Sequence, residues 1–278
     1  MTSLARPLDE APSGSLAVAW ARIWRARRLV ERNILVYRHQ WIIILSGVFE
    51  PIFYLLGIGL GIGGIVGNVP AELVQGREIT YLAFVAPALL ATAAMNGAVF
   101  ETIFNVFFKL NYAKTYDGVL ATPMGITEIA IGEMLWALMR SALYAVAMFV
   151  IMLVAGLILS PWGAAMIPAA LLVSAAFAAA GLAGTAYLRT VNDFDIPMGL
   201  IVMPMFLFSG TFFPIGVYPE PIQWLMQATP LFHAISLIRG LSTGLLGIQQ
   251  AWDLTYLLAF FAICTWIAMR QMERKLIK

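Results

Sequence analysis

A long apolar run begins at Trp41 and decides what kind of fold the chain can adopt. Residues 41–64 are 24 consecutive positions with a single ionisable side chain, Glu50. A helix crosses the hydrocarbon core of a bilayer with about 20 predominantly apolar residues. The apolar character then continues, with short polar breaks, as far as Met269. The sequence therefore predicts an all-α polytopic membrane protein.

The composition of the 278-residue chain agrees with a membrane location. Hydrophobic residues make up 61% of it and charged residues 12%, against about 25% charged residues in soluble domains. The formal net charge of +2 argues for neither nucleic acid nor acidic partners. One cysteine, Cys264, and two distant histidines, His39 and His233, form no cluster with metal-ligand spacing. We therefore expect no metal site and no catalytic residues.

Six stretches are long and apolar enough to be membrane spans, and they lie at residues 41–64, 79–104, 129–159, 162–188, 194–213 and 252–269. Residues 1–15 are polar, lack the apolar run of a signal peptide and are expected to form a disordered cytoplasmic tail. Residues 16–40 place apolar positions at helical spacing, with tryptophans and arginines among them. They predict an amphipathic interfacial helix. The alternative is a basic topology signal with no other role.

Lysines and arginines orient the six spans. An even number of spans puts both termini on one side, which then carries fourteen of these residues. The opposite side carries two, Arg77 and Arg239, and Arg140 lies within a span. Cytoplasmic loops are enriched in lysine and arginine. The sequence therefore predicts that both termini are cytoplasmic.

A string of glycines ends the first predicted span and contains a formal GxGxxG motif at residues 59–64. A dinucleotide site needs a strand before this motif and a helix after it, whereas here it follows an apolar span and precedes a loop. We interpret the glycines as sites of close helix packing or local unwinding. No GxxxxGK(S/T) motif occurs, so the chain is not expected to hydrolyse ATP through a phosphate-binding loop of its own.

Four ionisable residues that fall inside the predicted spans are Glu50, Glu101, Glu133 and Arg140. Burial against lipid is costly, roughly 2.5–3.5 kcal/mol for arginine at a helix centre, so these side chains should face one another or a polar cavity. Two interpretations compete: a structural ion pair between helices, and a cluster that contacts cargo or relays protons. We favour structural pairing, with Glu50 or Glu101 rather than Glu133 as the partner of Arg140.

The polar loop at residues 105–127 joins the second and third predicted spans on the cytoplasmic side. A short helix is expected to begin near Asp117 and to end before Pro123. Such a helix is a surface that another protein can bind, and an ordinary connecting loop is an equal alternative. Tyr116 and Asp117 are expected on its exposed side, so their truncation should open no cavity in the core.

Residues 214–247 are moderately apolar but are interrupted by four prolines and several glycines. Such a segment suits a re-entrant hairpin or short interfacial helices, which need protein around them within the membrane. A seventh span would also move the basic C-terminus outside, against the lysine and arginine distribution. Trp224, Phe232 and His233 are expected near the outer headgroups, with His233 as a structural hydrogen-bond partner.

An ordered set of short motifs adds a family resemblance. The motifs are Glu50-Pro51-x-x-Tyr54, Phe84-Val-Ala-Pro87, Ala94-Met-Asn96, Gly132-Glu133-x-x-Trp136, Ser209-Gly-Thr-Phe-Phe-Pro214, and Thr229-Pro-Leu-x-His233 followed by Arg239-Gly240. No single motif is specific, but in this order they resemble the type-2 ABC exporter permeases, most closely the nodulation protein J subgroup. The resemblance covers residues 41–247.

The resemblance implies a six-span permease in a bacterial cytoplasmic (inner) membrane, paired with a second permease. It implies a coupling helix, at residues 112–126, that inserts into a separate cytoplasmic ABC ATPase, and that ATPase would bind the ATP and Mg. The resemblance does not fix the cargo, but a pathway with many aromatic and few charged residues suits an amphipathic one, such as a lipid-linked saccharide, a glycolipid or a hydrophobic drug. The implied residues are Tyr112, Lys114, Tyr116, Asp117, Gly118 and Pro123 in the coupling helix, and Phe212, Phe213, Pro214, Trp224, Pro230, His233 and Arg239 in an outer gate.

Other classes of function compete with the exporter. A proton-coupled secondary transporter would use Glu50, Glu101 and Arg140 as its relay and would need no ATPase. An intramembrane enzyme would need a nucleophile or an acidic pair on one helix face, and the sequence offers no such set. A structural scaffold would have no need of the broken segment before the last span. The exporter permease is the function that accounts for most of these features.

Overall fold

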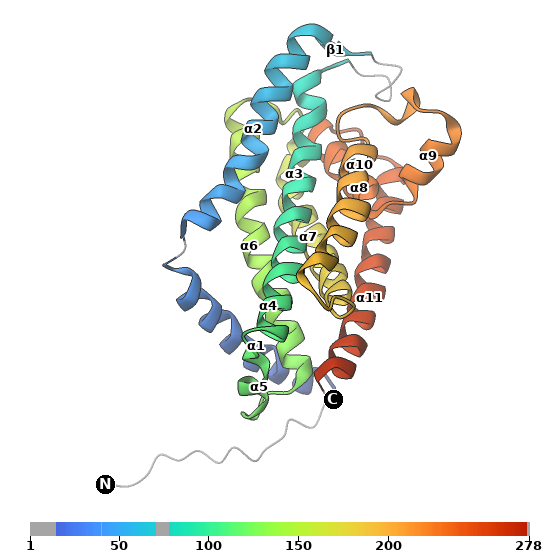
Figure 1. The fold of residues 1–278 in the computed structure, drawn as a ribbon. Coiled ribbons are helices and arrows are strands. Elements are labelled where there is room, and N and C mark those ends of the chain that lie inside the picture. The colour runs from blue at the N-terminus through green and yellow to red at the C-terminus, as the bar shows by residue number, and fades with distance from the viewer. Residues whose placement is uncertain (1–14, 40, 71–77, 277–278) are drawn as a thin grey trace.

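The computed structural model describes residues 15–39, 41–70 and 78–276 and shows a bundle of helices (Figure 1). The predicted disordered tail at residues 1–15 lies almost wholly outside the described residues. The all-α polytopic class is confirmed. Among the described residues, five helical segments are long and apolar enough to cross a membrane: Tyr81–Asn111, Ile126–Val154, Pro161–Thr185, Val191–Phe208 and Ile248–Leu276. The first predicted span is helix α2, which carries a shorter apolar stretch at Phe49–Ile65.

The elements follow one another in a simple order. The N-terminal half holds α1 (Ser15–Tyr37), α2 (Trp41–Val66), strands β1 (Asn68–Val69) and β2 (Ile79–Thr80), α3 (Tyr81–Phe100), the wide, π-helical turn η2 (Glu101–Asn105), α4 (Val106–Asn111), α5 (Thr115–Leu120) and α6 (Ile126–Val154). The C-terminal half holds η3 (Pro161–Ala165), α7 (Met166–Thr185), η4 (Val191–Phe194), η5 (Ile196–Val202), α8 (Met203–Phe208), η6 (Ile215–Val217), α9 (Glu220–Gln227), α10 (Pro230–Thr243) and α11 (Ile248–Leu276).

Helix α3 is the centre of the bundle. It packs against α2, α6, α7 and α10, and 17 of its 20 residues are buried. Seven of its residues are alanine and one is glycine, and such small side chains let neighbouring backbones approach closely within a membrane. The Thr80 side chain caps the helix by accepting a hydrogen bond from the Ala83 backbone N–H at 3.3 Å. The helices α2, α6, α7 and α10 are therefore all positioned by their packing against one apolar helix, α3.

A short antiparallel hairpin joins α2 to α3, and the sequence did not predict it. Val69 pairs with Ile79, and Asn68 with Thr80. The second span therefore begins at Tyr81 rather than at residue 79, because the two preceding residues are held in a strand. The glycine string lies within α2, and Gly59 faces Leu82 of α3. Close helix packing is thus the role of this glycine.

The other boundaries shift where the backbone bends. The third span ends at Val154, and Gly156 takes a left-handed conformation with φ 68°. The fifth ends at Phe208 rather than at residue 213, since Gly210 also has a positive φ, 75°. Within this span, the wide (π-helical) turn η5 precedes Pro204. Proline has no backbone N–H and so cannot donate the next hydrogen bond of a regular helix. The last helix is longer than predicted, Ile248–Leu276.

The two ends of the bundle differ in kind. The short helix α5, the N-terminal helix α1 and the end of α11 lie at one end, while the β1–β2 hairpin and α9 lie at the other (Figure 1). The segment predicted as a re-entrant hairpin contains α9 and α10, of 8 and 14 residues. Helix α10 packs against α3, α7 and α11. It is therefore surrounded by protein and is shorter than the helices that suit a full crossing.

The close contact between α3 and α6 gives a direct test of this packing. A Cβ atom at Gly97 would lie 2.9 Å from the Ser141 Cα atom and 2.7 Å from the Tyr144 ring. We expect Gly97→Ala to lower the thermal midpoint in detergent, because overpacking costs about 1–3 kcal/mol. Gly57 in α2 has no neighbour within 4 Å of such an atom, so Gly57→Ala is the matched control. Equal midpoints for the two variants would contradict the packing.

Candidate functional site

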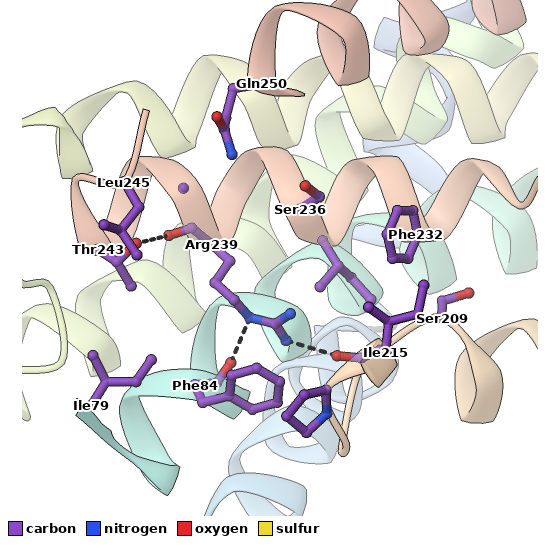
Figure 2. A pocket seen from close by; sticks show the side chains of 14 residues that line it. Ile79, Phe84, Ser209, Ile215, Phe232, Ser236, Arg239, Thr243, Leu245 and Gln250 are labelled. Atoms are coloured by element: carbon purple, nitrogen blue, oxygen red, sulfur yellow. Dashed lines mark hydrogen bonds between the residues drawn. The ribbon is translucent and has the colours of Figure 1, made fainter. Parts of the chain in front are cut away.

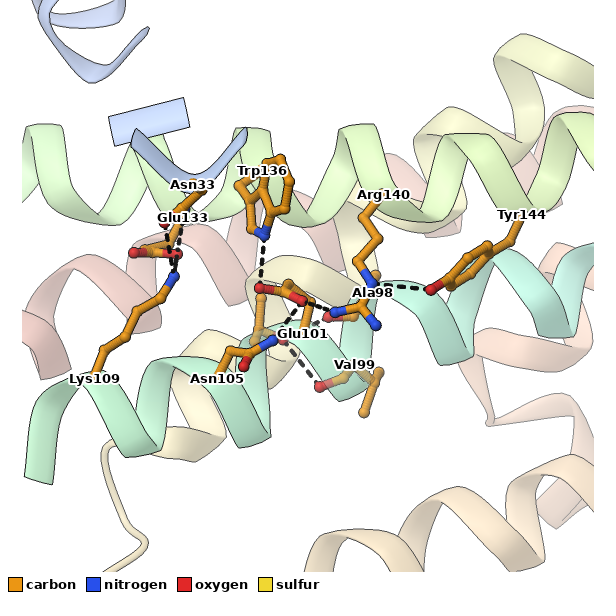
Figure 3. Close-up of polar contacts among 11 residues, drawn as sticks. Asn33, Ala98, Val99, Glu101, Asn105, Lys109, Glu133, Trp136, Arg140 and Tyr144 are labelled. Atoms are coloured by element: carbon orange, nitrogen blue, oxygen red, sulfur yellow. Dashed lines mark hydrogen bonds and ion pairs between the residues drawn. The ribbon is translucent and has the colours of Figure 1, made fainter. Parts of the chain in front are cut away.

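Glu101, at the start of the wide turn η2, is the hub of a buried polar cluster between α3 and α6. Its carboxylate pairs with the guanidinium of Arg140. It also accepts hydrogen bonds from Trp136 Nε1 at 2.7 Å and from Asn105 Nδ2 at 2.6 Å (Figure 3). Arg140 Nε donates to the Tyr144 hydroxyl at 2.9 Å. The prediction that Arg140 pairs with a carboxylate of another span is confirmed, with Glu101 as the partner.

Glu133 belongs to a second cluster on the same side of α6, closer to α5. Its carboxylate accepts a bond from Lys109 Nζ at 2.7 Å and one from Asn33 Nδ2 at 3.4 Å. Lys109 Nζ also donates to Asn33 Oδ1 at 3.3 Å. These contacts tie α1, α4 and α6 together. Lys109 was predicted to lie in a loop, and Asn33 was not predicted as a site residue.

A longer second span would have revealed the role of Lys109. Residues Glu101, Asn105 and Lys109 are spaced four apart, which places them on one face if the helix continues past residue 104. The helical segment does continue to Asn111. Trp136 and Arg140 have the same spacing on α6. Two facing polar stripes are therefore encoded in the sequence, although nothing in it shows that they meet.

The predicted cluster of four charges is not one cluster. Glu50 on α2 is exposed in the isolated chain and forms no ion pair with any residue that the structure describes. It lines a cavity of about 170 Å³ together with Asn96, Arg140 and Tyr144. Phe100, Phe206 and Tyr54 add aromatic walls. The cavity therefore combines one acidic, one basic and several amphipathic groups between α2, α3, α6 and α8.

Helix α5 coincides with the predicted short helix, but it is shorter than the range 112–126 and one side of it is buried. Tyr116 is 1% exposed and packs in an apolar cluster with Leu29, Val106 and Ile129. The expectation that Tyr116 lies on the exposed side is therefore wrong, because the turn that starts α5 directs its ring into the bundle. Burial, and then the negative charge of Glu133, raise the pKa of the Tyr116 hydroxyl well above its usual value.

The rest of the predicted coupling surface is exposed. The side chain of Asp117 and the backbone of Gly118 face outward on α5. Lys114, just before the helix, has a left-handed backbone with φ 44°. That conformation is rare for residues other than glycine and marks a sharp turn of the chain. The exposed residues of this surface are Tyr112, Lys114, Asp117, Gly118 and Pro123.

Helix α1 lies against the bundle near this surface. Its Ala26 and Leu29 side chains are buried, and Leu29 faces Gly132 of α6. Arg25 Nη2 forms an ion pair at 3.0 Å with Glu128 at the start of α6. Trp24 on another side of α1 is exposed. The amphipathic character predicted for residues 16–40 therefore has a protein-facing side and an outward side.

At the opposite end, His233 of α10 has a buried partner on α11. His233 Nδ1 lies 2.7 Å from Asp253 Oδ1, and the ring stacks on Tyr256 with centroids 3.9 Å apart. Asp253 also accepts a bond from Gln249 at 2.9 Å. Asp253 was not predicted as a site residue, although it falls inside the predicted sixth span, where a charged side chain needs a partner just as Glu50 does. His233 is thus a hydrogen-bond partner, as expected.

The other residues of the predicted outer gate are dispersed. Phe212 is buried against Phe206, whereas Phe213 is exposed. Trp224 on α9 is 77% exposed, and Pro230 is the first residue of α10. Arg239 lines a cavity at this end together with Pro214. The structure therefore places these residues at one end of the bundle without joining them in a single contact cluster.

Comparison with known families bears on this arrangement of helices. The ABC-2 type transporter family matches residues 26–242, from the middle of α1 to the end of α10. The chain belongs to the ABC-2 type transporter family. The match covers α5, both polar clusters and α10 as far as Ser242, whereas Asp253 and Tyr256, the partners of His233 on α11, lie beyond it.

Curated relatives of this ABC-2 transporter carry one name. Nodulation protein J of Rhizobium leguminosarum bv. trifolii is 32% identical over 236 residues, which is 84% of each chain. Nodulation protein J of Sinorhizobium fredii is 32% identical and covers 79% of each chain, and that of Rhizobium meliloti is 29% identical and covers 81% of each. This ABC-2 transporter is therefore a membrane subunit of an ABC transporter, a permease rather than a catalytic enzyme.

The Glu101–Arg140 pair generates a prediction about stability. We expect Arg140→Ala to lower the thermal midpoint strongly, because removing one member of a buried ion pair typically costs about 3–5 kcal/mol. Adding Glu101→Gln should recover part of the loss, since the orphaned charge is removed. Arg27 forms a largely exposed ion pair with Glu31, so Arg27→Ala is the control and should change the free energy of unfolding by about 1 kcal/mol or less. An unchanged midpoint in Arg140→Ala would show that the pair is dispensable.

Proposed function

We propose that this chain is the transmembrane subunit of an ATP-driven exporter that moves an amphipathic cargo out of the cytoplasm or the inner leaflet. A lipid-linked saccharide, a glycolipid and a hydrophobic drug are cargoes of this kind. The cavity beside Glu50 supports the proposal, because it sets carboxylate, guanidinium, amide and hydroxyl groups next to aromatic rings. Polar groups of this kind suit a sugar or headgroup, and the aromatic walls suit its apolar part.

One observation carries the proposal: a continuous helical segment, Tyr81–Asn111, carries one ion pair beside the cavity and a second near α5. Arg140 lines the cavity and pairs with Glu101 in η2. The same helical rod continues to Lys109, which pairs with Glu133, and Tyr116 of α5 lies within the electrostatic influence of Glu133. In this proposal, a displacement of α5 is transmitted to the cavity through α4 and η2, which are packed elements rather than a flexible loop.

We propose that a cytoplasmic ABC ATPase, which binds ATP and Mg, contacts and displaces α5, and that α5 is the coupling helix. Membership of the ABC-2 family implies such a partner. The exposed residues around α5 form the docking surface in this proposal. A second permease, identical or similar, completes the transporter. The exposed apolar side chains of η5 and α8, among them Leu200, Met203 and Leu207, suit contact with lipid or with that second subunit.

The proposed topology has six spans, with α2 as the first, in a bacterial cytoplasmic (inner) membrane. Both termini are cytoplasmic, and α9 and α10 form a re-entrant pair at the outer face. The arrangement in Figure 1 supports it, since α1, α5 and the end of α11 share one end of the molecule. The proton-coupled alternative is less well supported, because the Glu101 carboxylate is already engaged by three donors.

The coupling proposal is tested at Asp117, which is exposed. We expect Asp117→Ala to leave folding unchanged and to weaken ATPase association about tenfold, as the loss of one hydrogen bond to a charged group does. The measurement is copurification of the partner ABC ATPase, together with stimulated ATP hydrolysis. Tyr116→Ala provides the contrast: it should lower the thermal midpoint, since truncating a buried aromatic ring costs about 3–5 kcal/mol. Undiminished ATPase binding by Asp117→Ala would refute the assignment of this surface.

The re-entrant topology is tested by cysteine labelling in a Cys264→Ala background. Glu220 and Gln249 are exposed at the two ends of the α9–α10 segment. Cysteines at both positions should react with an impermeant thiol reagent added to intact cells. A cysteine at Asp117 is the control and should react only after the cells are permeabilised. Labelling of just one of the first two positions in intact cells would mean that the segment crosses the membrane.

A further inference from the structure

A cavity at the α10 end of the molecule contains an arginine without an acidic partner. The cavity measures about 140 Å³, several times the roughly 30 Å³ that one water occupies in the liquid. Its walls come from the start of α3, the bend after α8 and one side of α10 (Figure 2). Within the described part of the chain, Arg239 forms no ion pair.

The guanidinium of Arg239 is held in place by backbone groups and by a ring. Its Nε donates to the Phe84 carbonyl at 3.1 Å, and its Nη2 donates to the Gly210 carbonyl at 2.8 Å. The guanidinium carbon lies 3.8 Å from the centroid of the Phe84 ring. These contacts fix the orientation of the group and share its charge with dipoles. They provide no negative charge to neutralise it.

Part of the hydrogen-bonding capacity of Arg239 is left unused. An arginine side chain has five N–H donors, and the contacts with Phe84 and Gly210 engage two of its three nitrogens. In Figure 2 the third nitrogen, Nη1, has no bond to the residues drawn. A charge enclosed in protein without a counterion is costly. Arg239 therefore keeps a positive charge and N–H donors that an anion in the cavity could engage.

The lining of the cavity indicates the kind of anion. Ser209, Ser236 and Gln250 present polar groups to the same space as Arg239. Ile215 and Phe232 are among the apolar side chains that form the remaining wall. Arginine matches the geometry of carboxylate and phosphate oxygens better than other cations do. An oxyanion attached to an apolar group satisfies both parts of the lining.

We propose that this cavity binds the oxyanionic group, a phosphate or carboxylate, of an amphiphile, with Arg239 as its charged anchor. The inference does not depend on ATP-driven transport, because every residue of the site lies on this chain and none belongs to α5. In the proposed topology the site faces the outer leaflet, where the ligand is either a bilayer lipid or the exported cargo. A dissolved inorganic anion is the remaining source of the same chemistry.

The experiment uses the full chain purified in an uncharged detergent. Dioctanoyl phosphatidylglycerol and, separately, sodium phosphate are titrated at constant ionic strength, with the thermal midpoint and native mass spectrometry as readouts. The lipid should raise the midpoint saturably and add one tightly bound molecule. Arg239→Gln should weaken the apparent lipid affinity about tenfold or more, as expected when a hydrogen-bonded charge is removed.

Two further variants make the result decisive. Ser236→Leu fills the cavity but leaves Arg239 and its carbonyl contacts in place, so it should weaken lipid affinity to the same extent as Arg239→Gln. If Arg239→Gln does not fold, the lipid affinity of Ser236→Leu is the deciding measurement. Arg270 also stacks on an aromatic ring, Trp266 at 4.0 Å, but does not line this cavity, so Arg270→Gln should bind as the parent does. Equal lipid affinity in all variants would overturn the site, and a full effect of inorganic phosphate alone would overturn its preference for an amphiphile.

Discussion

The carboxylate of Glu101 is buried in the middle of an apolar bundle and is stable there only because three donors surround it. Arg140 supplies the opposite charge, and Trp136 and Asn105 satisfy the remaining oxygen lone pairs. A buried ion pair is a poor source of stability but is very sensitive to the loss of either member. The pair therefore specifies how α3 and α6 align more than it strengthens their contact. The cavity beside Glu50 depends on that alignment, since Arg140 forms part of its wall.

The continuous helical rod formed by α3, η2 and α4 connects this alignment to both ends of the bundle. It is helical from Tyr81 to Asn111, and most of its apolar length is buried. Near one end, the Phe84 carbonyl binds Arg239. Near the other, Lys109 pairs with Glu133. The proposed anion site, the cavity and the α5 surface are thus attached to one element. In the proposed transporter, a displacement at any of the three would act on the same helical backbone.

Much of the architecture was predictable because the bilayer permits few solutions. Helices must satisfy their own backbone groups in lipid, so apolar runs of sufficient length are enough to place α3, α6, α7 and α11 to within a few residues. Buried charges had to find partners, which is why the pairing of Arg140 with a carboxylate could be predicted. Proline positions predicted the broken segment that contains α9 and α10. The wide turns, the β1–β2 hairpin and the extension of the second span to Asn111 could not be predicted, because they depend on local bends that composition does not reveal.

The sequence by itself determined the class of the protein, the approximate helices and the need to pair its buried charges. The tertiary structure decided which charges meet. The sequence period shows which residues share one face of a helix, but it does not show which face of another helix packs against them. Only folding showed that Glu133 belongs to Lys109 and Asn33, that Asp253 holds His233, and that Glu50 faces a cavity. It also turned Tyr116 inward, because a six-residue helix is oriented by the elements against which it packs and not by its own pattern.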